Sequence, residues 1–198
     1  MARKQSYHHG NLREALLKAA IGLIAEVGPT AFTLREVARR AGVSHNAPYR
    51  HFRAKEDLIA AVATEGFIEL KRAMLRETRR KITVRDRLKY SGIAYVHFAI
   101  RHPEHFAIMF DAPLPSHRDS ELQQASDEAF QALMNFVKEC QDEKALPSGD
   151  PYQFALLAWS LVHGIAKLAI TKRLPYRSKT NVLKFAEFVI DDWLLKRR

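Results

Sequence analysis

Apolar residues recur at intervals of three and four along almost the whole chain, the spacing that places them on one face of an α-helix. The first such run lies within residues 11–27 and ends at Gly28-Pro29. No segment shows the alternation typical of a β-strand, and no repeat interrupts the helical pattern. We therefore predict an all-α fold of about nine helices.

Local signals bound these helices. Thr33 and Glu36 have the spacing of a capping box, and Asp150 followed by Pro151 marks the start of another helix. The predicted helices span residues 11–27, 33–41, 46–53, 55–80, 84–101, 105–110, 121–143, 150–170 and 180–196. We expect a small N-terminal domain of residues 1–54 and a larger domain of residues 55–198.

Positive charge is concentrated near the N-terminus. The net charge of the chain is +10. Residues 1–55 carry ten Lys or Arg and three Glu, a net charge of +7, whereas the remaining 143 residues carry 22 Lys or Arg and 19 Asp or Glu. A concentrated basic region suits a polyanion such as DNA, because neutralised phosphates release their counterions. The charge by itself leaves a solubilising surface or an acidic membrane as alternatives.

The cellular setting follows from what the sequence lacks. Cys140 is the only cysteine, so no internal disulfide forms and no cysteine spacing of a metal site exists. We find no signal peptide, and the longest apolar run, residues 154–170, is shorter than the roughly 20 residues that span a bilayer. These features predict a cytoplasmic protein with no membrane partner.

One stretch has the pattern of a helix-turn-helix. Within residues 33–52, Gly42 lies between two predicted helices, where a tight turn needs a small residue. Val37 and Val43 are placed to pack the two helices together. The second helix offers polar and aromatic side chains at its N-terminal end, where free N–H groups favour phosphate and side chains reach base edges in the major groove.

This region resembles the DNA-binding domain of the TetR family of bacterial regulators. The motifs that carry the resemblance are Ala41-Gly42-Val43-Ser44, Tyr49-Arg50-His51-Phe52 and Lys55-Glu56-Asp57-Leu58. The C-terminal part resembles the family in the number and length of its helices. Trp159, His163 and Gly164 are similar to the Trp-His-Gly signature of one branch of the family. The resemblance implies a homodimeric transcriptional repressor that binds a palindromic operator in double-stranded DNA and is released by a small-molecule effector.

The resemblance also implies roles for individual residues. The expected DNA-binding residues are Thr33, Ser44, His45, Asn46, Tyr49, His51 and Lys55. His45 and Asn46 would contact base edges, because an Asn amide pairs with adenine in a bidentate manner. Arg3 and Lys4 are placed for an arm over the minor groove. A role for Tyr49 in the small core of this domain is the alternative, since an amphipathic ring serves either purpose.

Two positions depart from the family pattern. Pro48 disfavours helical geometry at Ala47, so the recognition helix is expected to start late. Ala54 stands where a capping hydroxyl is expected before the next helix. Both departures leave the expected phosphate-binding groups in place.

The larger domain is expected to form both a dimer interface and a ligand pocket. The apolar helix at residues 154–170 and the wide apolar stripe of the last helix favour pairing with a second copy, with completion of the monomer core as the alternative. The candidate pocket residues are Phe67, Leu70, Met74, Phe98, Phe106, Met109, Phe110, Phe130, Met134, Trp159 and His163. Residues of these types also form ordinary cores, and His163 suits the role of a hydrogen-bonded core histidine.

Other functions have less support in the sequence. His97, His102 and His105 have no partner spacing of a known metal site, so no metal or cofactor is expected. The chain has no nucleophile elbow, phosphate loop or dinucleotide-binding glycine pattern, so we expect neither catalytic residues nor enzyme activity. A nucleoid-associated or cell-division protein that binds DNA and a protein partner remains the alternative to a ligand-controlled repressor.

Overall fold

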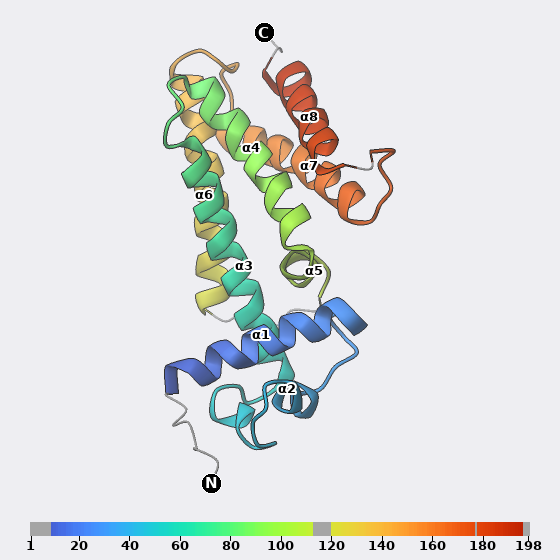
Figure 1. Cartoon of the computed structure of the whole chain (residues 1–198). Coiled ribbons are helices and arrows are strands. Elements are labelled where there is room, and N and C mark those ends of the chain that lie inside the picture. Colours follow the sequence, from blue (N-terminus) through green and yellow to red (C-terminus); the bar gives the residue numbers. More distant parts are fainter. Residues whose placement is uncertain (1–8, 113–119, 177, 196–198) are drawn as a thin grey trace. The chain divides into compact units, whose positions relative to one another are not determined.

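A computed structural model describes residues 9–112, 120–176 and 178–195 of the chain. Within these ranges it contains eight α-helices and no strand, which confirms the all-α prediction (Figure 1). The helices are α1 (His9–Val27), α2 (Leu34–Arg40), α3 (Lys55–Thr78), α4 (Val84–Arg101), α5 (Pro103–Asp111), α6 (Ser120–Asp142), α7 (Pro151–Ile170) and α8 (Lys179–Val189). A π-helical segment, Ile190–Leu195, continues α8. The minor-groove arm proposed at Arg3 and Lys4 lies outside the described residues.

About nine helices were predicted and the described residues contain eight α-helices; the difference lies at residues 46–53. The helix predicted at residues 46–53 is a single 3-10 turn, Pro48–Arg50. Pro48 has no N–H to donate to the carbonyl of Ser44 four residues earlier, and that carbonyl accepts instead from Ala47 N–H at 2.9 Å. The expected effect on Ala47 was wrong, because this residue keeps helical angles (φ −61, ψ −42).

The first compact unit is drawn from Met1–Glu65 and Glu104–Leu122. Within it α2 packs against α1 and against the 3-10 turn. Its core contains the fully buried Leu16, Val37 and Leu58. These side chains come from α1, α2 and the start of α3 respectively, and their burial holds the three helices in one arrangement.

The second compact unit is drawn from Gly66–Pro103 and Gln123–Arg198, and α4 packs against α7 and α8 at its centre. Gly92 permits this close packing. A Cβ atom on Gly92 would lie 2.9 Å from Ile190 Cδ1 and 3.1 Å from Val162 Cγ1. The chain division at Glu65 differs from the predicted functional boundary after residue 54, which remains a prediction.

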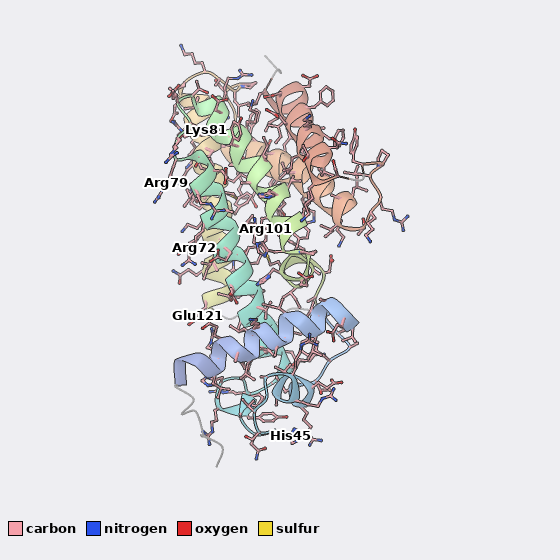
Figure 2. All side chains as sticks on the ribbon, in the orientation of Figure 1. His45, Arg72, Arg79, Lys81, Arg101 and Glu121 are labelled. Atoms are coloured by element: carbon pink, nitrogen blue, oxygen red, sulfur yellow. The ribbon has the colours of Figure 1, made fainter. Side chains whose placement is uncertain are left out.

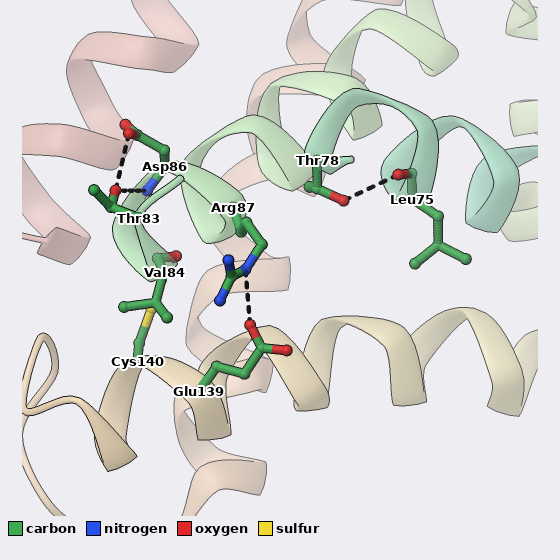
Figure 3. Close-up of polar contacts among 8 residues, drawn as sticks. All are labelled: Leu75, Thr78, Thr83, Val84, Asp86, Arg87, Glu139 and Cys140. Atoms are coloured by element: carbon green, nitrogen blue, oxygen red, sulfur yellow. Dashed lines mark hydrogen bonds and ion pairs between the residues drawn. The ribbon is translucent and has the colours of Figure 1, made fainter. Parts of the chain in front are cut away.

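Polar contacts fix the start of α4 against the end of α6 (Figure 3). Thr83 caps α4 by accepting a hydrogen bond from Asp86 N–H at 3.0 Å. Arg87 Nε donates to Glu139 at 2.9 Å, and the Cys140 thiol donates to the Val84 carbonyl at 3.3 Å. Burial raises the pKa of Cys140 to about 11, so this thiol keeps its proton and stays a donor.

The apolar helix α7 has the bounds expected from Asp150 and Pro151. It has 20 residues and, by length and composition alone, is the one helix in the described ranges that qualifies to cross a membrane. The helix is longer than the 17-residue apolar run, because Pro151 starts it three residues before that run. Yet α7 packs on α4, the behaviour of a core helix.

Candidate DNA-binding surface and apolar core site

The start of α2 is fixed by the predicted capping box. Thr33 Oγ1 accepts from Glu36 N–H at 3.2 Å, and Glu36 Oε2 accepts from Thr33 N–H at 2.7 Å and from the Thr33 hydroxyl at 2.9 Å. The hydrogen bond from the Thr33 hydroxyl, followed by that from its backbone, lowers the pKa of Glu36. The cap therefore contributes stability at pH values above the usual pKa of a Glu, and this stability is lost as the pH falls through the lowered pKa.

Gly42 turns the chain between α2 and the 3-10 turn. It has a positive φ of 68° and forms the αL position of a Schellman motif. In this motif Gly42 N–H donates to Arg39 at 3.2 Å and Val43 N–H donates to Ala38 at 3.0 Å. The glycine thereby sets the direction in which residues 43–50 leave α2.

Replacing Gly42 with Ala is expected to lower the free energy of unfolding by about 1 kcal/mol, the usual cost of a Cβ in the left-handed region. No heavy atom lies within 4 Å of the added Cβ, so backbone strain is the only expected cause. Urea unfolding monitored by circular dichroism measures the effect. An unchanged unfolding midpoint would contradict the assigned role of this glycine.

The segment after Gly42 places polar side chains on the surface. Ser44, His45, Asn46 and Tyr49 are exposed, and the Tyr49 side chain is 52% exposed. Figure 2 shows His45 on the outer side of this turn, directed away from α1. Pro48 and Phe52 are buried beneath them. The exposure of Tyr49 argues against the alternative that its ring fills the domain core.

The remaining predicted DNA-binding residues are partly engaged within the protein. Lys55 Nζ donates to the Thr30 carbonyl at 2.7 Å and lies 5.0 Å from the Phe32 ring centroid. His51 is half-buried, while Thr33 is exposed but has its hydroxyl bound to Glu36. An ammonium has three donors, so Lys55 retains two for a phosphate. The DNA contacts of all seven residues remain predictions.

Sequence reasoning passed over two exposed cations on the same surface. Arg50 and Arg53 are exposed on either side of His51. The local charge was the signal that could have identified them.

The cap missing at Ala54 is supplied by Asp57, whose carboxylate accepts from the N–H groups of Arg53 and Ala54 at 2.8 and 3.2 Å. This contact fixes the backbone between the 3-10 turn and α3.

Three polar side chains of the second unit meet where α4 packs on α7: Tyr95 is buried, and Trp159 and His163 are half-buried. Trp159 Nε1 donates to Tyr95 Oη at 3.1 Å, and Tyr95 Oη lies 2.8 Å from His163 Nδ1. Burial raises the pKa of Tyr95, which therefore keeps its proton. Because an indole N–H only donates, the Tyr95 oxygen is the acceptor of the hydrogen bond from Trp159. Sequence reasoning named Trp159 and His163 but missed Tyr95, which has no distinctive local pattern.

Replacing Tyr95 with Phe is expected to lower the free energy of unfolding by about 1–3 kcal/mol, because Trp159 and His163 lose a buried hydrogen-bond partner. Chemical denaturation measures the change. Tyr152, whose side chain is 52% exposed, provides the control. Tyr152→Phe should change stability by less than about 0.5 kcal/mol. Equal effects of the two substitutions would show that the Tyr95 hydroxyl has no structural role.

The eleven predicted pocket residues divide between the two compact units. Phe106, Met109 and Phe110 belong to the first unit. The second unit contains Phe67, Leu70, Met74, Phe98, Phe130, Met134, Trp159 and His163. Three of these residues form a row of ring contacts. The ring centroids of Phe130 and Trp159 are 6.1 Å apart, and those of Trp159 and His163 are 5.9 Å apart. Among the described residues, no group of three or more His, Cys, Asp or Glu is placed to hold a metal ion.

Comparisons with known proteins identify both parts of the chain. Residues 16–62 match the model of bacterial regulatory proteins of the tetR family, and residues 88–193 match the tetracyclin repressor-like C-terminal domain. The HTH-type transcriptional repressor Rv3405c of Mycobacterium tuberculosis is 35% identical over 83 residues, which are 42% of this chain and 44% of that protein. The match thus spans less than half of that relative's length.

Solved structures extend the similarity to nearly the whole chain. A protein of unknown function from Rhodococcus sp. RHA1 is 34% identical, with a TM-score of 0.81 over 94% of this chain and 96% of that one. AibR, solved in complex with isovaleryl coenzyme A and operator DNA, shares the fold with a TM-score of 0.71 at 16% identity, over 89% of this chain and 96% of that one.

The fold and matches define the class as a regulatory protein with an N-terminal helix-turn-helix and a C-terminal helical domain. More particularly, the chain belongs to the TetR family of bacterial regulatory proteins. The matched N-terminal family consists of bacterial regulatory proteins, and the Mycobacterium tuberculosis relative is a transcriptional repressor.

Proposed function

We propose that the protein is a homodimeric repressor of transcription in the cytoplasm, which binds a palindromic operator and is released by a small molecule. The observation that carries this proposal is the exposure of Ser44, His45, Asn46 and Tyr49 on the helix-turn-helix of a TetR-family chain. Its side chains are free to approach base edges, and the cations that flank it favour the phosphate backbone.

The proposed roles follow the chemistry of each side chain. His45 and Asn46 read base edges from the exposed turn. Ser44 and Tyr49 contact the DNA backbone or bases, whereas Thr33, His51 and Lys55 contact phosphates. These contacts position the turn in the major groove, and the symmetry of two copies requires a palindromic site with half-sites about 34 Å apart.

The exposed apolar surface of α7 and α8 supports a homodimer. Leu157 and Leu168 on α7 are 43% and 45% exposed, and Phe188 on α8 is 55% exposed. Monomeric proteins rarely leave several large apolar side chains exposed on adjacent helices, and pairing with a second copy would bury them. The same pairing explains the apolar character of α7 without a membrane.

The apolar core around Trp159 and His163 is the proposed effector site. Together with Gly164, these residues support membership of the family branch with the Trp-His-Gly signature. AibR supports effector control by analogy, since its complex contains a coenzyme A ester. Because α3 continues from the first compact unit into the second, an effector that shifts α3 would change the spacing of the two recognition turns.

Selection of binding sites from genomic fragments with the full chain tests this function. We expect a few palindromic sites, and a stabilising compound from a metabolite screen should weaken binding to them at least tenfold. Widespread binding without a shared palindrome would instead support the nucleoid-associated alternative. Equal operator affinity with and without every stabilising compound would contradict effector control.

A further inference from the structure

We propose that a cleft between the end of α4, the end of α7 and the start of α8 binds small amphipathic carboxylates. The cleft encloses about 650 Å³, within the range of small-molecule sites. Its apolar wall is formed by Ile100, Ala169, Leu174, Pro175, Tyr176 and Val182. The Tyr176 ring packs 5.4 Å from that of Phe185, which holds this part of the wall against α8. This wall suits the apolar part of a ligand.

The charge of the cleft is of one sign. Lys172 and Lys179 line it, and no carboxylate does among the described residues. Two other clefts of this unit are lined by both basic and acidic side chains. The first contains Arg85, Lys184, Glu187, Asp191 and Asp192, and the second contains Glu69, Arg76, Glu77 and Arg101. Two cations beside an apolar wall select a ligand with an anionic head and an apolar body.

Lys172 occupies a position that local structure reserves for glycine. It has a φ of 57° and is the αL residue of a Schellman motif that ends α7. Lys172 N–H donates to Ala169 at 3.1 Å, and Arg173 N–H donates to Leu168 at 2.8 Å. A lysine here strains the backbone where glycine would not. Strain by itself assigns no role, since Lys144 has a similar φ; what distinguishes Lys172 is that it lines the cleft.

Lys179 is also locally disfavoured. It lies in the first turn of α8, where no acidic residue is present and the helix dipole repels a cation. The two disfavoured lysines line the same cleft, although seven residues separate them in the sequence. We infer from this convergence that both ammonium groups serve to bind an anion.

The chain contains a matched control for Lys172. Lys144 has a φ of 56° and occupies the same position in the motif that ends α6. Its N–H donates to Gln141 at 3.0 Å, and Ala145 N–H donates to Cys140 at 2.7 Å. Lys144 is exposed and does not line the cleft. Replacing either lysine with Gly relieves the same backbone strain, whereas only Lys172→Gly removes a cation from the cleft.

Isothermal titration calorimetry of the full chain tests the proposal with octanoate, octanol and acetate as probes. Octanoate should bind at least tenfold more tightly than octanol or acetate. Lys172→Gly and Lys179→Gln should each weaken octanoate binding about fivefold, the effect of losing one solvent-exposed ion pair. Lys144→Gly should leave the affinity unchanged.

Two results would overturn the proposal: octanol binding as tightly as octanoate, or equal octanoate affinity of Lys172→Gly and Lys144→Gly. The urea-unfolding midpoints of both Gly variants should rise, which verifies that each variant folds. The assay contains no DNA, so its outcome is independent of the proposed repressor function.

Discussion

Replacing Phe188 with Asp is expected to convert the proposed homodimer into monomers at micromolar concentration and to weaken operator binding at least a hundredfold. Phe188 is the most exposed large apolar side chain of α8. In a two-fold interface the substitution occurs twice, and each copy loses apolar burial and places a carboxylate in the interface.

Analytical ultracentrifugation measures the oligomeric state, and fluorescence anisotropy with labelled operator measures the affinity. Ile82→Asp is the matched control, because Ile82 is 93% exposed on the connection between α3 and α4. This control should remain dimeric and bind the operator normally. A dimeric Phe188→Asp variant would place the interface elsewhere than on α8.

Operator affinity is expected to fall about a thousandfold between 50 and 200 mM salt, the behaviour of a complex with about six phosphate contacts. The excess charge of residues 1–55 is the physical reason. Lys55→Gln should reduce the slope of log affinity against log salt by about 2, one phosphate contact for each subunit. Fluorescence anisotropy over a salt series measures both quantities.

Two controls separate phosphate contacts from base contacts. Asn46→Ala should leave the salt slope unchanged and relax the preference for the bases that Asn46 contacts. Lys144→Gln removes an exposed charge from the second unit and should change neither slope nor preference. If Lys55→Gln retains the full slope, its hydrogen bond to the Thr30 carbonyl is a structural contact and the phosphate role is wrong.

Helix prediction succeeded where local signals were strong. Residues 84–101 form α4 with the predicted bounds, and the capping box at Thr33 is present. It failed at residues 46–53, where polar side chains gave no clear apolar spacing and Pro48 removed a backbone donor. The missing cap at Ala54 was read correctly from that residue, but the replacement by Asp57 depends on side-chain geometry.

The core site shows a different limit. Trp159 and His163 were recognised because they lie four residues apart on one helix and resemble a family signature. Tyr95 was missed because its contact with His163 joins helices 68 residues apart in sequence. Sequence spacing along a single helix carries no information about which side chain of another helix lies opposite it.

By itself the sequence determined the all-α class, the position of the helix-turn-helix and the location of the excess positive charge, because periodicity, caps and charge are local properties of the chain. Tertiary structure alone decided that Tyr95 connects Trp159 to His163, and that Lys172 and Lys179 line one cleft. Such pairings depend on the packing of helices distant in sequence. The burial of whole helix faces determines these pairings, whereas the residues adjacent in sequence do not.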